Sequence, residues 1–276
     1  MKRLLKIELR KILSYSTFWV LSGITFGIYF FFLLIGSQIN FNFDGFDTNV
    51  YFRFPTVWQT IAYYSSWFNL LLVLLIVIIT GNEFSFKTFR QNAIDGLTRR
   101  ELFISKLLLI LLFAFAAFLV TFISAFIIGV IYTDNFSIEF VMQDIYFVFA
   151  FFIQSVGLMS IAFLISLLLR NIAASIVVFI GVYIFELIIR AFFAIMSIDW
   201  GQYLPFNVLS NLCNAPSFSK MITNPMIKES VANATITTQV NQQFTDVNYG
   251  ITIILSLSFS IIFLYFSYLI LNKRDL

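Results

Sequence analysis

Two charged residues, Glu186 and Arg190, stand inside an otherwise apolar stretch of the chain. They are four positions apart with the acid first, so on a helix they share one face and can pair. An ionisable side chain at membrane depth is costly unless it is paired or hydrated. The pair therefore predicts either a polar lining of a substrate path or dimer interface, or a structural contact with Arg190 reaching out to the lipid headgroups.

A second charged stretch, residues 81–106, reads GNEFSFKTFRQNAIDGLTRRELFISK. It mixes charges of both signs with aromatic side chains, and it is longer than a connection between adjacent helices requires. Thr98 followed by Glu101 forms a capping-box pattern, which favours a helix running into the next apolar stretch. Gly96 predicts the end of a preceding helix over Phe84–Ile94. Two such helices joined by a glycine turn predict a docking surface for a partner; a solvated charged loop is the alternative.

Residues 81–88 nearly match the phosphate-binding pattern G-x-x-x-x-G-K-[ST]. Phe86 replaces the second glycine, and its side chain would obstruct the loop that cradles phosphates. The preceding apolar run also has the length of a membrane span rather than of a strand. We therefore predict that this chain binds no nucleotide, and that it is not an enzyme.

Composition narrows the remaining chemistry. The chain has no histidine and a single cysteine, Cys213, which excludes histidine-based metal sites, imidazole catalysis and an internal disulfide. No basic block lies outside the segments that flank the apolar runs, so nucleic-acid binding is not expected. Of the 276 residues, 60% are hydrophobic and only 11% are charged. A soluble domain carries about a quarter charged residues, so the composition predicts an all-α membrane protein.

Six apolar segments are long enough to cross a bilayer, which takes roughly 20 helical residues. The first follows a basic start but is too long for a signal peptide, so we predict that it is retained. Only Arg170 and Asn171 separate the fourth and fifth segments, which predicts a tight helical hairpin. The six predicted spans are Thr17–Ile35, Ile61–Thr80, Leu107–Tyr132, Ile145–Leu169, Ile172–Ile195 and Gly250–Leu271.

The basic residues orient these spans, because cytoplasmic loops carry an excess of lysine and arginine. With both termini in the cytoplasm, all but four of the 17 basic residues lie inside; the exceptions are Arg53, Arg190, Lys220 and Lys228. We therefore predict a multi-pass protein of the plasma (inner) membrane, N-in and C-in. Residues 17–276 form its transmembrane domain, with a cytoplasmic loop at 81–106 and a long polar external segment at 197–248.

The lead-in, residues 1–16, places Leu5, Leu9, Ile12 and Leu13 on one helical face beside a cationic face. Such a helix can lie in the membrane interface against anionic headgroups; a plain basic flank is the alternative. In the first span, Gly23 and Gly27 form a G-x-x-x-G pattern, which predicts a helix-packing face.

This arrangement resembles the permeases of ABC-2 type exporters. The resemblance covers essentially the whole chain: a basic amphipathic lead-in (LLKIELRKIL), six spans, a long loop between spans two and three, and a short charged tail at residues 273–276. Within the loop, the family's acidic residue, threonine–arginine stretch and lysine entering span three are matched by Glu83, Lys87, Thr88, Arg90, Thr98, Arg99 and Lys106.

The resemblance implies that the lead-in is an interfacial helix and that Phe84–Ile94 is a coupling helix seated on a separate ATPase subunit. ATP and magnesium would then be bound by that subunit, and this chain would pair with a second permease chain, identical or not. The coupling residues implied are Glu83, Phe84, Lys87, Thr88, Phe89, Arg90, Arg99 and Arg100. The polar character of residues 197–248 departs from the family's re-entrant outer gate and suggests an added external subdomain.

Two other functional classes are alternatives to an ABC-2 permease. An ATP-independent secondary transporter or channel would use ionisable groups near the midplane, often in inverted halves, and Glu186 is the one acid there. A membrane-embedded enzyme without histidine would need paired carboxylates or a serine–lysine dyad, and Glu186 has no second intramembrane acid.

Overall fold

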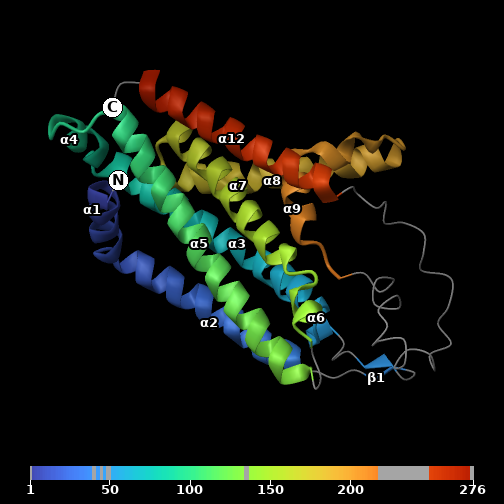
Figure 1. The fold of residues 1–276 in the computed structure, drawn as a ribbon. Coiled ribbons are helices and arrows are strands. Elements are labelled where there is room, and N and C mark those ends of the chain that lie inside the picture. The colour runs from blue at the N-terminus through green and yellow to red at the C-terminus, as the bar shows by residue number, and fades with distance from the viewer. Residues whose placement is uncertain are drawn as a thin grey trace.

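The computed structural model describes residues 2–38, 42–43, 46–47, 51–133, 137–216 and 249–273. Lys220, Lys228, Arg274 and the second part of the external segment, residues 217–248, lie outside the described residues. The described chain is a helical bundle (Figure 1). Its six longest helices are α2 (Ser16–Gln38), α3 (Thr56–Ser85), α5 (Arg99–Tyr132), α7 (Tyr146–Leu169), α8 (Ile172–Ile195) and α12 (Tyr249–Lys273).

Each of these six helices is long and apolar enough to cross a membrane, which indicates a multi-pass membrane protein. Helices suit lipid because all of their backbone hydrogen bonds are made within the segment. The six predicted spans are thus confirmed as helices, but two begin several residues earlier than predicted. Helix α3 starts at Thr56 rather than Ile61, and α5 starts at Arg99 because it includes the capped lead-in to the span.

Shorter elements connect the long helices. Helix α1 (Lys2–Leu13) precedes α2, α4 (Thr88–Ile94) lies between α3 and α5, and α6 (Ile138–Met142) precedes α7. Two-residue strands, β1 (Asn42–Phe43) and β2 (Phe46–Asp47), pair antiparallel after α2. After α8 come the 3-10 turn η2 (Asp199–Tyr203), helix α9 (Pro205–Ser210) and the 3-10 turn η3 (Asn211–Cys213).

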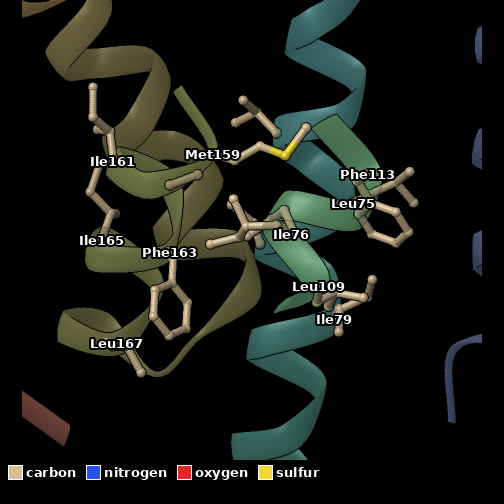
Figure 2. Close-up of a cluster of buried hydrophobic side chains, with 14 of the residues drawn as sticks. Leu75, Ile76, Ile79, Leu109, Phe113, Met159, Ile161, Phe163, Ile165 and Leu167 are labelled. Atoms are coloured by element: carbon tan, nitrogen blue, oxygen red, sulfur yellow. The ribbon is translucent and has the colours of Figure 1, made fainter. Parts of the chain in front are cut away.

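Helix α7 is the centre of the bundle and contacts α3, α5, α8 and α12. Two-thirds (67%) of its span is buried, against 17% for α2, α8 and α12. Figure 2 shows the apolar cluster at this centre. Its labelled side chains come from α3 (Leu75, Ile76, Ile79), α5 (Leu109, Phe113) and α7 (Met159, Ile161, Phe163, Ile165, Leu167).

Small residues let the helices approach closely at two glycines. A Cβ added to Gly81 of α3 would lie 2.4 Å from Ile172 Cγ1 and 3.3 Å from its Cα, at the start of α8. A Cβ added to Gly157 of α7 would lie 2.4 Å from Leu209 of α9 and 3.0 Å from Ser260 of α12. Interfaces of this kind are typical of membrane helices, and they hold α8, α9 and α12 against the centre.

The predicted capping box is confirmed: the backbone N–H of Glu101 donates to the Thr98 hydroxyl, and the backbone N–H of Thr98 donates to the Glu101 carboxylate. Gly96 has φ +91°, the left-handed conformation expected of a glycine that ends a helix. The prediction of one helix over Phe84–Ile94 is wrong at its start. Helix α3 continues through Ser85, and the chain then turns at Lys87, whose φ is +55°.

Candidate functional site

The residues of the predicted docking surface gather at one end of the bundle. The start of α1, the end of α12 and α4 all lie at this end (Figure 1). The exposed side chains of the α4 region include Phe86, Lys87, Arg90, Gln91, Ile94 and Asp95, with Phe86 64% and Ile94 77% exposed. This outer face therefore combines two large apolar side chains with two cations.

The inner face of α4 is fixed by an aromatic pair. Phe89 is buried and packs on Phe84 of α3, with ring centroids 4.8 Å apart. A cation lies over each ring: Lys106 Nζ of α5 is 5.7 Å from the centre of Phe89, and the Arg170 guanidinium is 5.5 Å from that of Phe84. Cation–aromatic contacts of this length are attractive. The pair thus ties α4 to α5 and to the turn between α7 and α8.

Beneath Phe89 lies a buried cluster of charges. Lys106 Nζ is 2.7 Å from Glu8 Oε2 of α1 and 2.7 Å from Glu83 Oε1 of α3. Lys11 Nζ of α1 lies 3.2 Å from the same Glu83 oxygen, and the Ser105 hydroxyl donates to Glu8 Oε1 at 3.0 Å. Glu8, Glu83 and Lys106 are each at most 3% exposed. The cluster joins three helices that are distant in the sequence.

The cluster is balanced, with two acids and two ammonium groups. Burial alone would disfavour the charged form of Glu8, but Lys106 and then Lys11 and Ser105 favour it, so the pKa of Glu8 lies below its ordinary value. A buried ion pair becomes strongly destabilising when one partner is removed, because a lone charge is left behind. One oxygen, Glu83 Oε2, is buried and accepts no hydrogen bond from the part of the chain that the structure describes.

The eight predicted coupling residues divide into three groups. Lys87, Arg90 and Arg100 are exposed, whereas Phe84, Thr88 and Arg99 are half-buried. The Thr88 hydroxyl donates to the Glu83 carbonyl at 3.3 Å, and the Arg99 guanidinium donates to the Asn272 carbonyl of α12. Glu83 and Phe89 are buried. Those two side chains hold α4 in place from within, while Phe86 and Ile94 supply its outer apolar surface.

Sequence reasoning missed Glu8 and gave α1 a different buried face. The structure buries Leu4, Glu8 and Ile12, which follow one another at helical spacing, and leaves Leu13 49% exposed. Lys6 and Arg10 are exposed on the other side of the helix. The available signal was a single acid among the basic residues of the lead-in, aligned with two aliphatic side chains.

Residues 81–88, which nearly match the phosphate-binding pattern, do not have the conformation of that motif. Gly81–Ser85 form the last turns of α3, a helix rather than the glycine-rich loop that follows a strand.

The second predicted site, Glu186 and Arg190 in α8, faces α9. The Glu186 carboxylate accepts hydrogen bonds from the backbone N–H groups of Phe206 and Asn207, at 3.1 and 2.7 Å. Arg190 donates to the side-chain oxygen of Asn207. Although both charged side chains are within the described residues, they form no ion pair with each other. An acid at a helix start satisfies N–H groups that have no partner inside the helix, so the two residues anchor α9 to α8.

The predicted packing face of the first span has no neighbour in the described part of the chain. A Cβ added to Gly23 or Gly27 would meet no atom within 4 Å.

No protein-family model matches the chain, and no curated protein has a significantly similar sequence.

Proposed function

We propose that this chain is the membrane-spanning permease subunit of an ATP-driven exporter of the ABC-2 type. In this proposal α4 is the coupling helix on which a separate ATPase subunit sits, and that subunit binds ATP and magnesium. The observation that carries the proposal is the form of α4. It is a short helix anchored from within by Phe89. Its outer face offers Arg90 and Ile94 to a partner, and the turn before it adds Phe86 and Lys87.

The position of α4 supports a cytoplasmic partner. It shares one end of the bundle with the start of α1 and the end of α12 (Figure 1). Exposed cations at this end include Lys6, Arg10, Lys87, Arg90 and Arg100, and the positive-inside rule places such an end in the cytoplasm. The orientation we propose is N-in and C-in in the plasma (inner) membrane, with α1 lying at the interface. The permease would work as a pair with a second permease chain.

The bonding of Glu186 also bears on the choice of function. An ion-coupled transporter needs a midplane group that is able to exchange an ion or a proton. Glu186 instead accepts two backbone hydrogen bonds from α9. This role as an anchor favours the ATP-driven mechanism over the ATP-independent transporter or channel.

Affinity purification of the tagged chain from its native membrane, followed by mass spectrometry, tests the proposal. We expect a second protein with ATPase sequence motifs to be recovered in near-equal amount. Recovery of the chain alone, as intact oligomers, would contradict the proposal and favour the ATP-independent transporter or channel.

A matched pair of variants locates the contact. Ile94→Ala removes an apolar side chain that is 77% exposed on α4, and Ile138→Ala makes the same change at a side chain that is 83% exposed on α6, at the other end of the bundle. We expect Ile94→Ala to lower the recovered ATPase about tenfold, because exposed apolar anchors dominate docking energies. Ile138→Ala should leave the recovery unchanged. Equal effects of the two variants on ATPase recovery would exclude α4 as the specific docking site of the ATPase.

A further inference from the structure

Three helices depend on one side chain, Lys106. Its ammonium binds Glu8 of α1 and Glu83 of α3, and the Phe89 ring of α4 lies over it. Lys106 contacts Glu8 of α1 and Phe89 of α4, so it connects these two helices without needing a direct contact between them. A displacement of α4 would therefore change the surroundings of the ammonium group that binds α1.

Glu8 is the part of this cluster that holds α1. The buried face of α1 consists of Leu4, Glu8 and Ile12, packed against α5, while its other sides carry exposed residues such as Lys6 and Arg10. The attraction between Glu8 and Lys106 is strong because water is excluded from it. Two opposite charges attract about four times more strongly near a protein surface than in water, and more strongly still where water is excluded.

Phe89 is what excludes water on the side of α4. It is 2% exposed, and its ring lies between Lys106 and the outer face of the helix. If α4 moves outward, the ring leaves Lys106 and water reaches the ion pairs. The attachment of α1 then weakens.

The cluster also contains a second carboxylate oxygen that can serve as an acceptor. Glu83 Oε1 receives both Lys106 and Lys11, whereas Glu83 Oε2 is buried and has no hydrogen-bond partner among the described residues. When α1 shifts, Lys11 can transfer to the vacant oxygen while Lys106 keeps its own. Two discrete sets of contacts are the usual basis of a conformational switch.

We propose that this buried cluster links α4 to α1, so that displacement of α4 from Lys106 releases α1 from the bundle. The link concerns contacts within this chain. Its use by an ATPase, which would move α4 and thereby α1, rests on the proposed function.

Cysteine labelling of the full-length chain in lipid vesicles tests the link. Ile12→Cys places a thiol on the buried face of α1, where the native side chain is 1% exposed. The native Cys213, buried in η3 near the other end of the bundle, reports on the integrity of the fold. The rate of modification by a small uncharged maleimide is followed at both sites by peptide mass spectrometry.

The test variant is Phe89→Leu, which keeps an apolar side chain but removes the ring over Lys106. We expect it to raise the labelling rate at position 12 about tenfold, as expected for loss of a buried cation–aromatic contact. Ile94→Leu, on the exposed side of the same helix, is the control and should change nothing. An unchanged rate at position 12 in Phe89→Leu would overturn the link, and so would a parallel rise at Cys213.

A double-mutant cycle shows whether the charges transmit the effect. Glu8→Gln keeps the size of the side chain and removes its charge, and it should itself raise the labelling rate at position 12. In the Glu8→Gln background, Phe89→Leu should add little, because both changes act on one interaction. Effects that multiply independently would overturn the link. No ATPase takes part, so failure here is distinguishable from failure to recover a partner chain.

Discussion

A lysine ammonium that water does not reach is stable only when carboxylates surround it, and Lys106 has Glu8 and Glu83 at 2.7 Å each. Replacing it with methionine keeps an unbranched side chain of nearly the same length and leaves both acids buried. Lys11 remains beside Glu83, so the uncompensated charge falls mainly on Glu8. We expect Lys106→Met to lower the stability of the bundle by about 3–5 kcal/mol.

This loss is measured as a lower apparent Tm in detergent, followed by the fluorescence of the four tryptophans. Lys6→Met, an equivalent change at an exposed position of α1, is the control and should leave the Tm unchanged. If Lys106→Met melted like the control, the cluster would contribute little to folding.

The charge of Glu8 also predicts how stability depends on pH. Although burial opposes its charge, Lys106, Lys11 and Ser105 together lower the pKa of Glu8. The folded state therefore binds a proton less readily than the unfolded state. The stabilisation is complete above the ordinary carboxyl pKa, about 4.3, and is lost as the pH falls through the lowered value. We expect the difference in Tm between the native chain and Glu8→Gln to be constant from pH 7 to about 5 and to shrink below that. A difference that stays the same down to pH 3 would contradict this assignment.

At the scale of elements, α9 depends on a contact with a neighbouring helix. It has six residues, too few to be stable alone, and its first backbone N–H groups donate to Glu186 of α8. Glu186→Ala removes this acceptor. We expect α9 and the adjoining η3 to loosen, so that the buried Cys213 reacts with maleimide about tenfold faster. Glu139→Ala, at an exposed acid in α6, should have no effect. Equal reactivity in both variants would mean that packing alone holds α9.

An element could be predicted from the sequence when the pattern that specifies it lies within the element itself. The long helices are encoded locally, because only an unbroken run of some 20 apolar residues can cross lipid, and the Thr98 cap and Gly96 turn are local patterns as well. The start of α4 is not encoded by a local pattern. The turn before it is made by Lys87 in a left-handed conformation, where a glycine would have marked the turn in the sequence.

The ion cluster is harder still to predict, since Glu8 and Lys106 are 98 positions apart. Their contact depends on how α1, which precedes the first span, packs against α5, and that is a property of the folded bundle. The resemblance to the ABC-2 permeases drew attention to the acid and the lysine of the loop, Glu83 and Lys106. It could not place them inside rather than on the docking surface, because burial is decided by α1 and α4 together.

At the scale of the whole molecule, the bundle is built around α7 and leaves the outer helices largely uncovered. Only 17% of the most apolar 18 residues of α2 are buried. A Cβ added to Gly23 or Gly27 would meet no atom of the described residues within 4 Å. Lipid covers such a face in a single chain. In a pair of these chains, the G-x-x-x-G pattern would let a second helix approach closely.

The double variant Gly23→Leu, Gly27→Leu distinguishes these two surroundings. The single chain has open space there, so its Tm should be unchanged. A helix packed against the glycines would be pushed away, and we expect the fraction of dimers counted by single-molecule photobleaching in vesicles to fall about tenfold. Ala116→Leu, which also enlarges a small side chain at an exposed helix position, on α5, is the control and should leave the dimers intact. Dimers that persist in the glycine variant would place the contact between chains on another helix and leave α2 facing lipid.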